Sequence, residues 1–280
     1  MKLAFTKMHG IGNDYIYVNC MERAPENPEE IARRLSPRHF AVGSDGLVLI
    51  LPSTVADFRM RMFNADGSEG KMCGNATRCI GKYVYDNGLT GKTELTLETL
   101  SGIKHLKLFP ENGKVVSVSV DMGAYILAPK DIPMTAQGAS FIDQPIEVHG
   151  ETVRATALSV GNPHCVIFVE DERALDLEAI GPLYENLPLF PERVNTEFVR
   201  LIDRSTIAMR VWERGSGETY ACGTGACAAA SAAVLNGHCD ADSPITVKLI
   251  GGDLSITVSS DGRITMTGPA AKVYDGVAEL

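Results

Sequence analysis

Two segments of the chain carry a cysteine directly followed by a glycine and small residues, and a constant distance separates them. The stretch "KMCGNATRC" covers 71–79 and "YACGTGACAAA" covers 220–230, so that Cys222 minus Cys73 is 149. The same offset of 149 relates the pairs Gly12 and Gly161, Asn13 and Asn162, Phe63 and Trp212, Gly102 and Gly251, and Gly113 and Gly262. Anchors spread over so much of the chain in one register argue against chance. We infer two halves with the same fold, built by duplication. Shorter periods of about 20–50 residues would indicate solenoids or propellers.

Each half shows the same order of predicted elements, which defines a mixed α/β (α+β) fold of two pseudo-symmetric domains. The pattern predicts strands at 14–19 and 164–170, 47–52 and 196–202, and 58–67 and 206–217, with β-hairpins over 92–123 and 243–268. It predicts helices at 28–36 and 176–185, and at 74–86 and 223–236 directly after the two cysteines. Gly88 and Gly237 provide stops for the last two helices. Helix 223–236 is almost wholly small and apolar, so we expect it to be buried within its own half.

Bulk composition excludes several classes of protein. A chain of 280 residues with 45 % apolar residues is long enough for a packed core, and its formal net charge of −9 argues against binding nucleic acid or an anionic membrane. We recognise neither a signal peptide nor an apolar run of about 18 residues that would span a membrane. The odd count of seven cysteines indicates reduced thiols and a cytoplasmic location.

The two repeated cysteines stand where predicted helices begin, and this suggests chemistry. A helix N-terminus presents unpaired N–H groups and positive potential, which lower a thiol pKa and bind carboxylates. Two such sites face to face would suit stereochemical inversion, with one thiolate removing a proton from carbon and the other thiol delivering one from the opposite side.

Other uses of the cysteines are weaker interpretations. A structural role is kept for Cys20, Cys79, Cys165, Cys227 and Cys239. No metal site is expected, because the spacings within each cysteine pair exceed those typical of zinc ligands and no nearby histidine completes a cluster. A Cys–His hydrolase could use His164, but that mechanism does not explain why the thiol is duplicated. A P-loop is not indicated, because neither glycine segment contains its lysine.

The motifs resemble those of the diaminopimelate epimerase family over nearly the whole chain. The resemblance is carried by "MHGIGNDYIYVN", "FNADGSE" with "MCGNATRC", "SVGNPHCVIFV", "ERGSGETYACGTGAC" and "GPAAKVYDG". It implies an isomerase that works without pyridoxal phosphate or any other cofactor and interconverts LL- and meso-diaminopimelate in lysine and peptidoglycan precursor synthesis. It also implies two domains, each a mixed sheet rolled around a central helix, with the active site between them.

The resemblance further assigns roles to individual residues. It implies that Cys73 and Cys222 are the acid/base pair, with His164 and Glu213 tuning the thiols and Tyr274 at the interface of a homodimer. The residues implied in substrate binding are Asn13, Asn64, Gly74, Asn75, Asn162, Asn195, Glu213, Arg214, Gly223 and Thr224. An arginine suits the distal carboxylate of diaminopimelate, and side-chain or backbone acceptors suit its ammonium group.

Two departures from the family pattern affect these assignments. Where many members read "CGNGARC", this chain has Ala76 and Thr77, a change that favours helix. Some members have a substrate-contacting glutamine where this chain has Gly46, which offers no side chain. Because the terminal segment returns to the first domain in the family, we expect domains of 1–122 plus 268–280 and of 123–267.

Three alternatives remain at this level. The first is a related proline or hydroxyproline racemase, although these typically carry histidine where this chain has Asn75. The second is the related isomerase group without the cysteine pair. The third is a thiol redox protein that uses Cys73 and Cys222 as a switch, which predicts a stable disulfide and no exchange of substrate protons with solvent.

Overall fold

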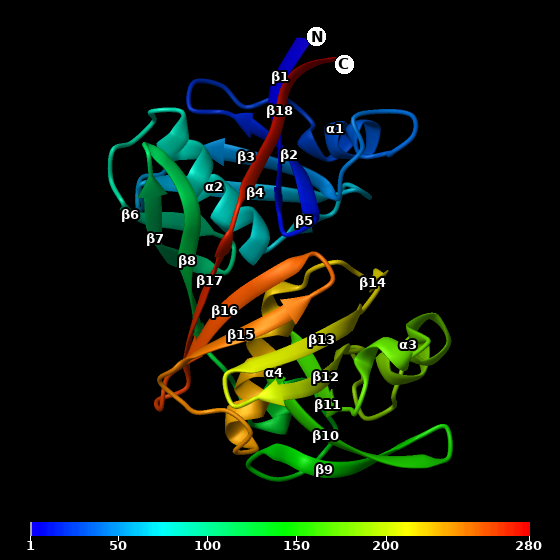
Figure 1. Ribbon diagram of the computed structural model, residues 1–280. Helices are drawn as coiled ribbons and strands as arrows, with labels where there is room; N and C mark the ends of the chain where they lie inside the picture. The colour runs from blue at the N-terminus through cyan, green and yellow to red at the C-terminus, as the bar shows by residue number, and fades with distance from the viewer. Residues whose placement is uncertain (1) are drawn as a thin grey trace. The chain divides into compact units, whose positions relative to one another are not determined.

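The computed structural model describes residues 2–280, and contacts divide the chain into two compact units (Figure 1). Unit 1 comprises Met1–Asp121 and Thr267–Leu280, and unit 2 comprises Met122–Met266. The two boundaries expected from the sequence fall after residues 122 and 267, each one residue later than the boundary between the units in the structure. Each unit has the mixed α/β composition expected from the sequence.

Unit 1 is a mixed sheet with two helices. Its elements are β1 (Lys2–Gly10), β2 (Asn13–Asn19), α1 (Pro28–Leu35), β3 (Gly46–Leu51), β4 (Phe58–Asn64), β5 (Glu69–Gly70), α2 (Gly74–Asp86), β6 (Glu94–Thr99), β7 (Gly102–Glu111), β8 (Lys114–Ala124) and β18 (Ala271–Glu279). The pairing runs β18–β1–β2–β3–β4–β6–β7–β8, with β2–β3 and β4–β6 parallel and the rest antiparallel. The C-terminal strand β18 therefore completes the sheet of unit 1 beside β1.

Unit 2 repeats this arrangement. Its elements are η1 (Pro129–Asp131), β9 (Phe141–Val148), β10 (Glu151–Ser159), β11 (Pro163–Phe168), η2 (Glu172–Ala174), α3 (Leu177–Glu185), β12 (Asn195–Asp203), β13 (Thr206–Glu213), β14 (Gly217–Glu218), α4 (Gly223–Leu235), β15 (Pro244–Leu249), β16 (Gly252–Val258) and β17 (Arg263–Pro269). The pairing runs β9–β10–β11–β12–β13–β15–β16, with β11–β12 and β13–β15 parallel. Strand β9 thus occupies the place beside β10 that β18 has beside β1.

The offset of 149 holds closely for the elements that carry the cysteines. Both the bounds of β1 and β10 and those of α2 and α4 differ by 149. The register agrees as well, because Tyr15 pairs with Gly46 in unit 1 and His164 pairs with Asn195 in unit 2. The repeat read from the sequence is therefore a repeat of strand register.

One anchor of the repeat is wrong by a residue. Gly102 pairs with Thr99 at the β6–β7 turn, and the corresponding pair at the β15–β16 turn is Gly252 with Leu249 rather than a pair with Gly251. Both turn glycines have positive φ, 91° and 140°, which a glycine adopts readily. The segment between α4 and β15 is one residue longer than that between α2 and β6, and this shifts the hairpin by one position.

Helix α4 forms the centre of unit 2, as its small apolar sequence predicts. It contacts β10, β11, β12, β13, β15 and β16. Most of its residues are buried, including every position from Gly225 to Ala233. Because alanine and glycine project little from the backbone, the surrounding strands can approach the helix on all sides.

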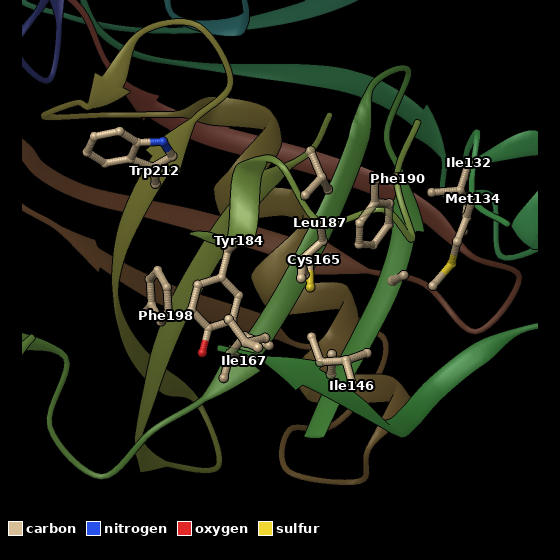
Figure 2. Packing of buried hydrophobic residues seen from close by; sticks show 14 of the residues in the cluster. Ile132, Met134, Ile146, Cys165, Ile167, Tyr184, Leu187, Phe190, Phe198 and Trp212 are labelled. Carbon is tan, nitrogen blue, oxygen red and sulfur yellow. The ribbon is translucent and has the colours of Figure 1, made fainter. Parts of the chain in front are cut away.

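A second apolar cluster in unit 2 joins α3 to the sheet (Figure 2). Tyr184 on α3 meets Phe198 on β12 edge to face, with ring centroids 5.1 Å apart, and Trp212 on β13 belongs to the same cluster. Burying these aromatic side chains fixes α3 against β12 and β13. These strands lead into residues that the sequence predicts to be functional.

None of the seven cysteines, all of which lie in the described part, forms a disulfide. Burial raises the pKa of the Cys79 and Cys20 thiols to about 11 each. We therefore expect the free energy of unfolding to fall between pH 9 and 11, because the unfolded thiols ionise near 8.5 whereas the folded ones keep their protons. The contribution is about 3 kcal/mol for the fully buried Cys79 thiol. Urea unfolding of wild type and Cys79→Ala at several pH values tests this, and an equal pH slope in both proteins would refute it.

Candidate active site

Cys73 caps the first turn of α2 in unit 1. Its backbone is extended, and the backbone N–H of Ala76 donates to its Sγ at 3.5 Å. The side chain is half-buried, whereas Gly74 and Asn75 behind it are buried. The helix therefore begins at the position that the sequence predicts, with the thiol at the end where N–H groups lack partners within the helix.

Cys222 occupies the equivalent position at the start of α4. The backbone N–H of Gly225 donates to its Sγ at 3.3 Å, and the hydroxyl of Thr224 lies 3.5 Å from the same atom. A Cβ at Gly225 would approach an oxygen of Glu197 to 2.8 Å. Glycine is therefore needed where the first half has Ala76, because a carboxyl group lies against this turn.

Burial reverses the expected behaviour of the Cys222 thiol. The side chain is only 5 % exposed. Burial raises its pKa well above the ordinary value, and the charge of Glu213 raises it further, whereas the hydrogen bonds involving Thr224 and Gly225 oppose the change. The sequence-based prediction that the helix start lowers the thiol pKa is therefore wrong for Cys222 in this structure. The raised pKa favours the protonated thiol at Cys222.

An asparagine stands beside each cysteine, and the two are equivalent in the repeat. In unit 1 the Cys73 thiol donates to Oδ1 of Asn13 at 3.4 Å, and Nδ2 of Asn13 donates to Asp45 at 2.7 Å. In unit 2 Nδ2 of Asn162 donates to the Thr224 hydroxyl at 3.4 Å. Each asparagine is thus part of the surroundings of its own thiol.

The groups that hold the two asparagines differ. Asp45 accepts a hydrogen bond from Asn13 and forms an ion pair with Arg38. Asp45 also accepts from the backbone N–H of Asp14, and Arg38 also pairs with the Asp14 carboxylate. Burial raises the pKa of Asp45. In unit 2 the corresponding support comes from His164, whose Nε2 lies 3.0 Å from Oδ1 of Asn162.

The turn after β13 carries Glu213 and Arg214. The backbone N–H of Arg214 donates to Oδ1 of the buried Asn195 at 2.9 Å, and Nη1 of Arg214 donates to the carbonyl of Glu192. Glu213 accepts from the hydroxyl of Thr219. Asn195 therefore positions the backbone of this turn. The residue of unit 1 that corresponds to Glu213 is Asn64, whose Nδ2 donates to the hydroxyl of Ser68 at 2.9 Å.

A buried carboxylate at the end of α3 anchors the same turn. Glu185 accepts from Nε1 of Trp212 at 2.7 Å, from the backbone N–H of Gly215 at 2.9 Å and from Arg193 at 2.8 Å. It thereby fixes both ends of the segment that contains Glu213 and Arg214. A functional role for Glu185 was not predicted from the sequence, since a glutamate at the end of a helix carries no distinguishing local signal.

We expect Glu185→Gln to lower kcat/KM about 10-fold, mainly through KM, because an amide oxygen cannot serve all three donors and its NH2 group would face one of them. The unpaired donors should also cost about 1–3 kcal/mol of stability. Steady-state kinetics and thermal unfolding measure the two effects. Glu178→Gln, on an exposed position of the same helix, is the matched control. Unchanged KM in Glu185→Gln would contradict the positioning role.

Asn75 has its own buried support. The guanidinium of Arg78, which is fully buried in α2, donates to Oδ1 of Asn75 at 2.8 Å, to the carbonyl of Gly74 and to the carbonyl of Pro269. It therefore connects the first turn of α2 to the returning C-terminal segment. Like Asp45, Glu185 and Glu197, this residue was missed from the sequence.

Gly46 follows Asp45 and pairs with Asn64 across β3 and β4, whereas Tyr274 lies on the C-terminal strand. A Cβ at Gly46, whose φ is 156°, would approach the carbonyl oxygen of Phe63 to 1.9 Å, so this backbone does not admit the glutamine of some family members. Tyr274 lies on β18, is 42 % exposed and meets Phe5 edge to face.

Within each unit the structure gathers most of the predicted residues around the start of the cysteine helix. Unit 1 brings Asn13, Cys73, Gly74 and Asn75 together, and unit 2 brings Asn162, His164, Cys222, Gly223 and Thr224 together. Each group combines a thiol with helix amides that suit a carboxylate.

Other surfaces show no relation to these groups. A pocket of about 650 Å³ in unit 2 is lined by residues such as Arg154, Phe168 and His238, and none of the predicted site residues lines it. Among residues 2–280 no group of three His, Cys, Asp or Glu side chains is arranged to hold a metal ion. In the same range no helix is long and apolar enough to cross a membrane.

Solved structures define the class of fold. The chain is similar to a phenazine biosynthesis protein of the PhzF family from Bacillus anthracis, with a TM-score of 0.73, 19 % identity and full coverage of both chains. It is also similar to a probable proline racemase from Agrobacterium radiobacter, with a TM-score of 0.73, 15 % identity, and coverage of 99 % of this chain and 92 % of the other. The fold is therefore that of the two-domain racemase and PhzF-type proteins.

Sequence relatives define the family within that class. The diaminopimelate epimerase family model matches residues 5–128 and 156–273. A diaminopimelate epimerase from Acetivibrio thermocellus is 55 % identical over 99 % of each chain, and one from Methanococcus maripaludis is 54 % identical over 99 % of this chain and 100 % of its own. The chain belongs to the diaminopimelate epimerase family.

Proposed function

We propose that this protein is an isomerase that interconverts LL- and meso-diaminopimelate. The observation that carries the proposal is the pair of equivalent thiols, each capping the helix of its own unit, in a chain 55 % identical to a diaminopimelate epimerase. A duplicated thiol is what inversion at a carbon requires, because the proton leaves one face and returns to the other.

In the proposed reaction one sulfur, as thiolate, takes the α-proton, and the other, as thiol, delivers its own proton to the opposite face of the same carbon. The electron pair released from the C–H bond is delocalised into the α-carboxylate before the new C–H bond forms. N–H groups of the two helix starts, at Gly74 and Asn75 and at Gly223 and Thr224, hold that carboxylate and stabilise the developing charge. The raised pKa of Cys222 suits this thiol to the role of proton donor.

The remaining predicted residues would bind the distal amino-acid group of the substrate. Arg214, in a partly exposed turn, offers a guanidinium for the distal carboxylate. Side-chain amide and carboxylate oxygens suit the distal ammonium, and the proposed set is Asn13, Asn64, Asn162, Asn195 and Glu213. The thiols and amides carry the whole reaction, so the proposal includes no cofactor.

We further propose a cytoplasmic homodimer that serves lysine and peptidoglycan precursor synthesis. The exposed Tyr274 on β18 supports an interface at this strand. Size-exclusion chromatography with light scattering of wild type and Tyr274→Ala tests the dimer. A monomeric wild type would reject it.

The sharpest test of the reaction uses LL-diaminopimelate in deuterated water without added pyridoxal phosphate. We expect meso product with deuterium at one α-carbon, because the delivered proton comes from a thiol that has exchanged with solvent. Mass spectrometry and chiral chromatography measure both. Exchange with proline but not with diaminopimelate would establish the racemase alternative instead. A stable disulfide between Cys73 and Cys222 in the working form, with no deuterium incorporation, would establish a redox role.

A further inference from the structure

His164 and Glu197 form a fully buried pair on neighbouring parallel strands. His164 lies on β11 and Glu197 on β12, both side chains are 0 % exposed, and Nδ1 of His164 lies 2.7 Å from Oε1 of Glu197. The carboxyl group also lies against the first turn of α4, next to Gly225. The pair therefore stands directly behind the Cys222 helix start.

The hydrogen bonds of Asn162 indicate which imidazole nitrogen carries a proton. Nδ2 of Asn162 is directed to the hydroxyl of Thr224, so its Oδ1 faces Nε2 of His164 at 3.0 Å. A carbonyl oxygen only accepts, so Nε2 carries hydrogen. Nδ1 must then either accept a hydrogen bond from a neutral Glu197 or, in an imidazolium, donate one to an ionised Glu197.

The surroundings favour the neutral carboxylic acid. Oε2 of Glu197 is buried without a hydrogen-bond partner, which is costly for a carboxylate and much less so for the carbonyl oxygen of an acid. Burial raises the pKa of Glu197 above its ordinary value, and this outweighs the opposing effect of His164. Glu213, Cys165 and Cys222 also act on Glu197 or are acted on by it, and none of these three groups is a cation.

Unit 1 has no counterpart of this pair. The positions equivalent to His164 and Glu197 are Tyr15 and Val48, and Asn13 is held by Asp45 instead. The pair is thus a feature of the Cys222 half alone. It provides an uncharged way to fix Asn162 beside a thiol that already lies near the negative charge of Glu213.

We propose that Glu197 is a positioning residue that, as a neutral acid, donates to Nδ1 of His164 and so keeps His164 as the Nε2–H tautomer that orients Asn162 beside Cys222. The geometry then forms one chain from Glu197 through His164, Asn162 and Thr224 to Cys222. The kinetic consequence rests on the proposed epimerase function, but the tautomer does not.

Two substitutions separate the neutral pair from an ion pair. In Glu197→Gln the amide can still donate to Nδ1, so we expect kcat/KM within about 3-fold of wild type. In Glu197→Leu no donor remains, the imidazole can adopt the other tautomer, and we expect kcat/KM to fall about 10–100-fold. Rescue by glutamine but not leucine identifies a hydrogen-bond donor. A loss in Glu197→Gln as large as that in Glu197→Leu would overturn the proposal.

The tautomer is read directly by ¹⁵N NMR of protein labelled at its six histidines, with His164→Asn used to assign the signal. We expect one protonated nitrogen, Nε2, from pH 6 to 8 in wild type and in Glu197→Gln, and a mixture of tautomers in Glu197→Leu. Two protonated nitrogens in wild type would show an imidazolium and overturn the proposal. Because this spectrum needs no substrate, it decides the inference even if diaminopimelate is not turned over.

Discussion

A Cys222→Ser variant is expected to fold as stably as wild type and to lose at least about 10³-fold in kcat for diaminopimelate epimerisation. Serine is a good N-cap residue, so its hydroxyl can still accept from the N–H of Gly225 at the start of α4. The hydroxyl is, however, a far weaker acid than a thiol and can neither become the base nor readily deliver the proton. The variant therefore keeps the helix-capping role of this side chain and removes its acid/base role.

The same substitution at Cys73 should have the same result, because each sulfur has to act in every inversion. Cys239→Ala is the matched control, since this thiol is also buried but lies in the segment after α4 and caps no helix. Chiral chromatography measures turnover and urea unfolding measures stability. If either serine variant keeps turnover within 10-fold of wild type, the two-base scheme is wrong.

Arg78→Met is expected to cost about 2–4 kcal/mol of unfolding free energy and to reduce kcat/KM as well. Methionine fills a similar volume but leaves the acceptors on Asn75, Gly74 and Pro269 without their donor. The stability loss arises from buried carbonyl groups that lose a charge-assisted hydrogen bond. The kinetic loss arises because Asn75, proposed to bind the substrate carboxylate, loses its orientation.

The repeat supplies the comparison for this substitution. The equivalent position in α4 is Cys227, so the scaffold accepts an uncharged side chain at this place in the other half. Urea unfolding of wild type, Arg78→Met and Arg78→Lys should give a graded loss, with lysine intermediate because its ammonium can reach some of the acceptors. If Arg78→Met unfolds at the same urea concentration as wild type, these hydrogen bonds make no net contribution to the free energy of unfolding.

Local sequence signals predicted the elements that carry the two thiols. The cysteine-glycine motifs stand where α2 and α4 begin, and Asn87 and Asn236 end these helices before Gly88 and Gly237, which both have positive φ. These signals are reliable because helix starts and stops depend on a few adjacent residues. The small side chains of α4 likewise predicted its burial.

The errors and omissions have a common origin in contacts between distant segments. The sequence placed the hairpin glycine at Gly251, but strand pairing selects Gly252. The helix start suggested an acidic thiol at Cys222, but burial and the carboxylate of Glu213 on β13 raise its pKa. Glu185 and Glu197 have no local pattern that marks them, because their partners lie on other elements.

The sequence by itself determined that this protein consists of two related halves, each with a thiol at a helix start, because duplication preserves spacing and helix boundaries are local. Only the tertiary structure decided what surrounds each thiol. Asp45 holds Asn13 in one half, whereas His164 and Glu197 hold Asn162 in the other. Protonation and orientation depend on burial and on groups brought together by strand pairing, and a linear pattern does not contain that information.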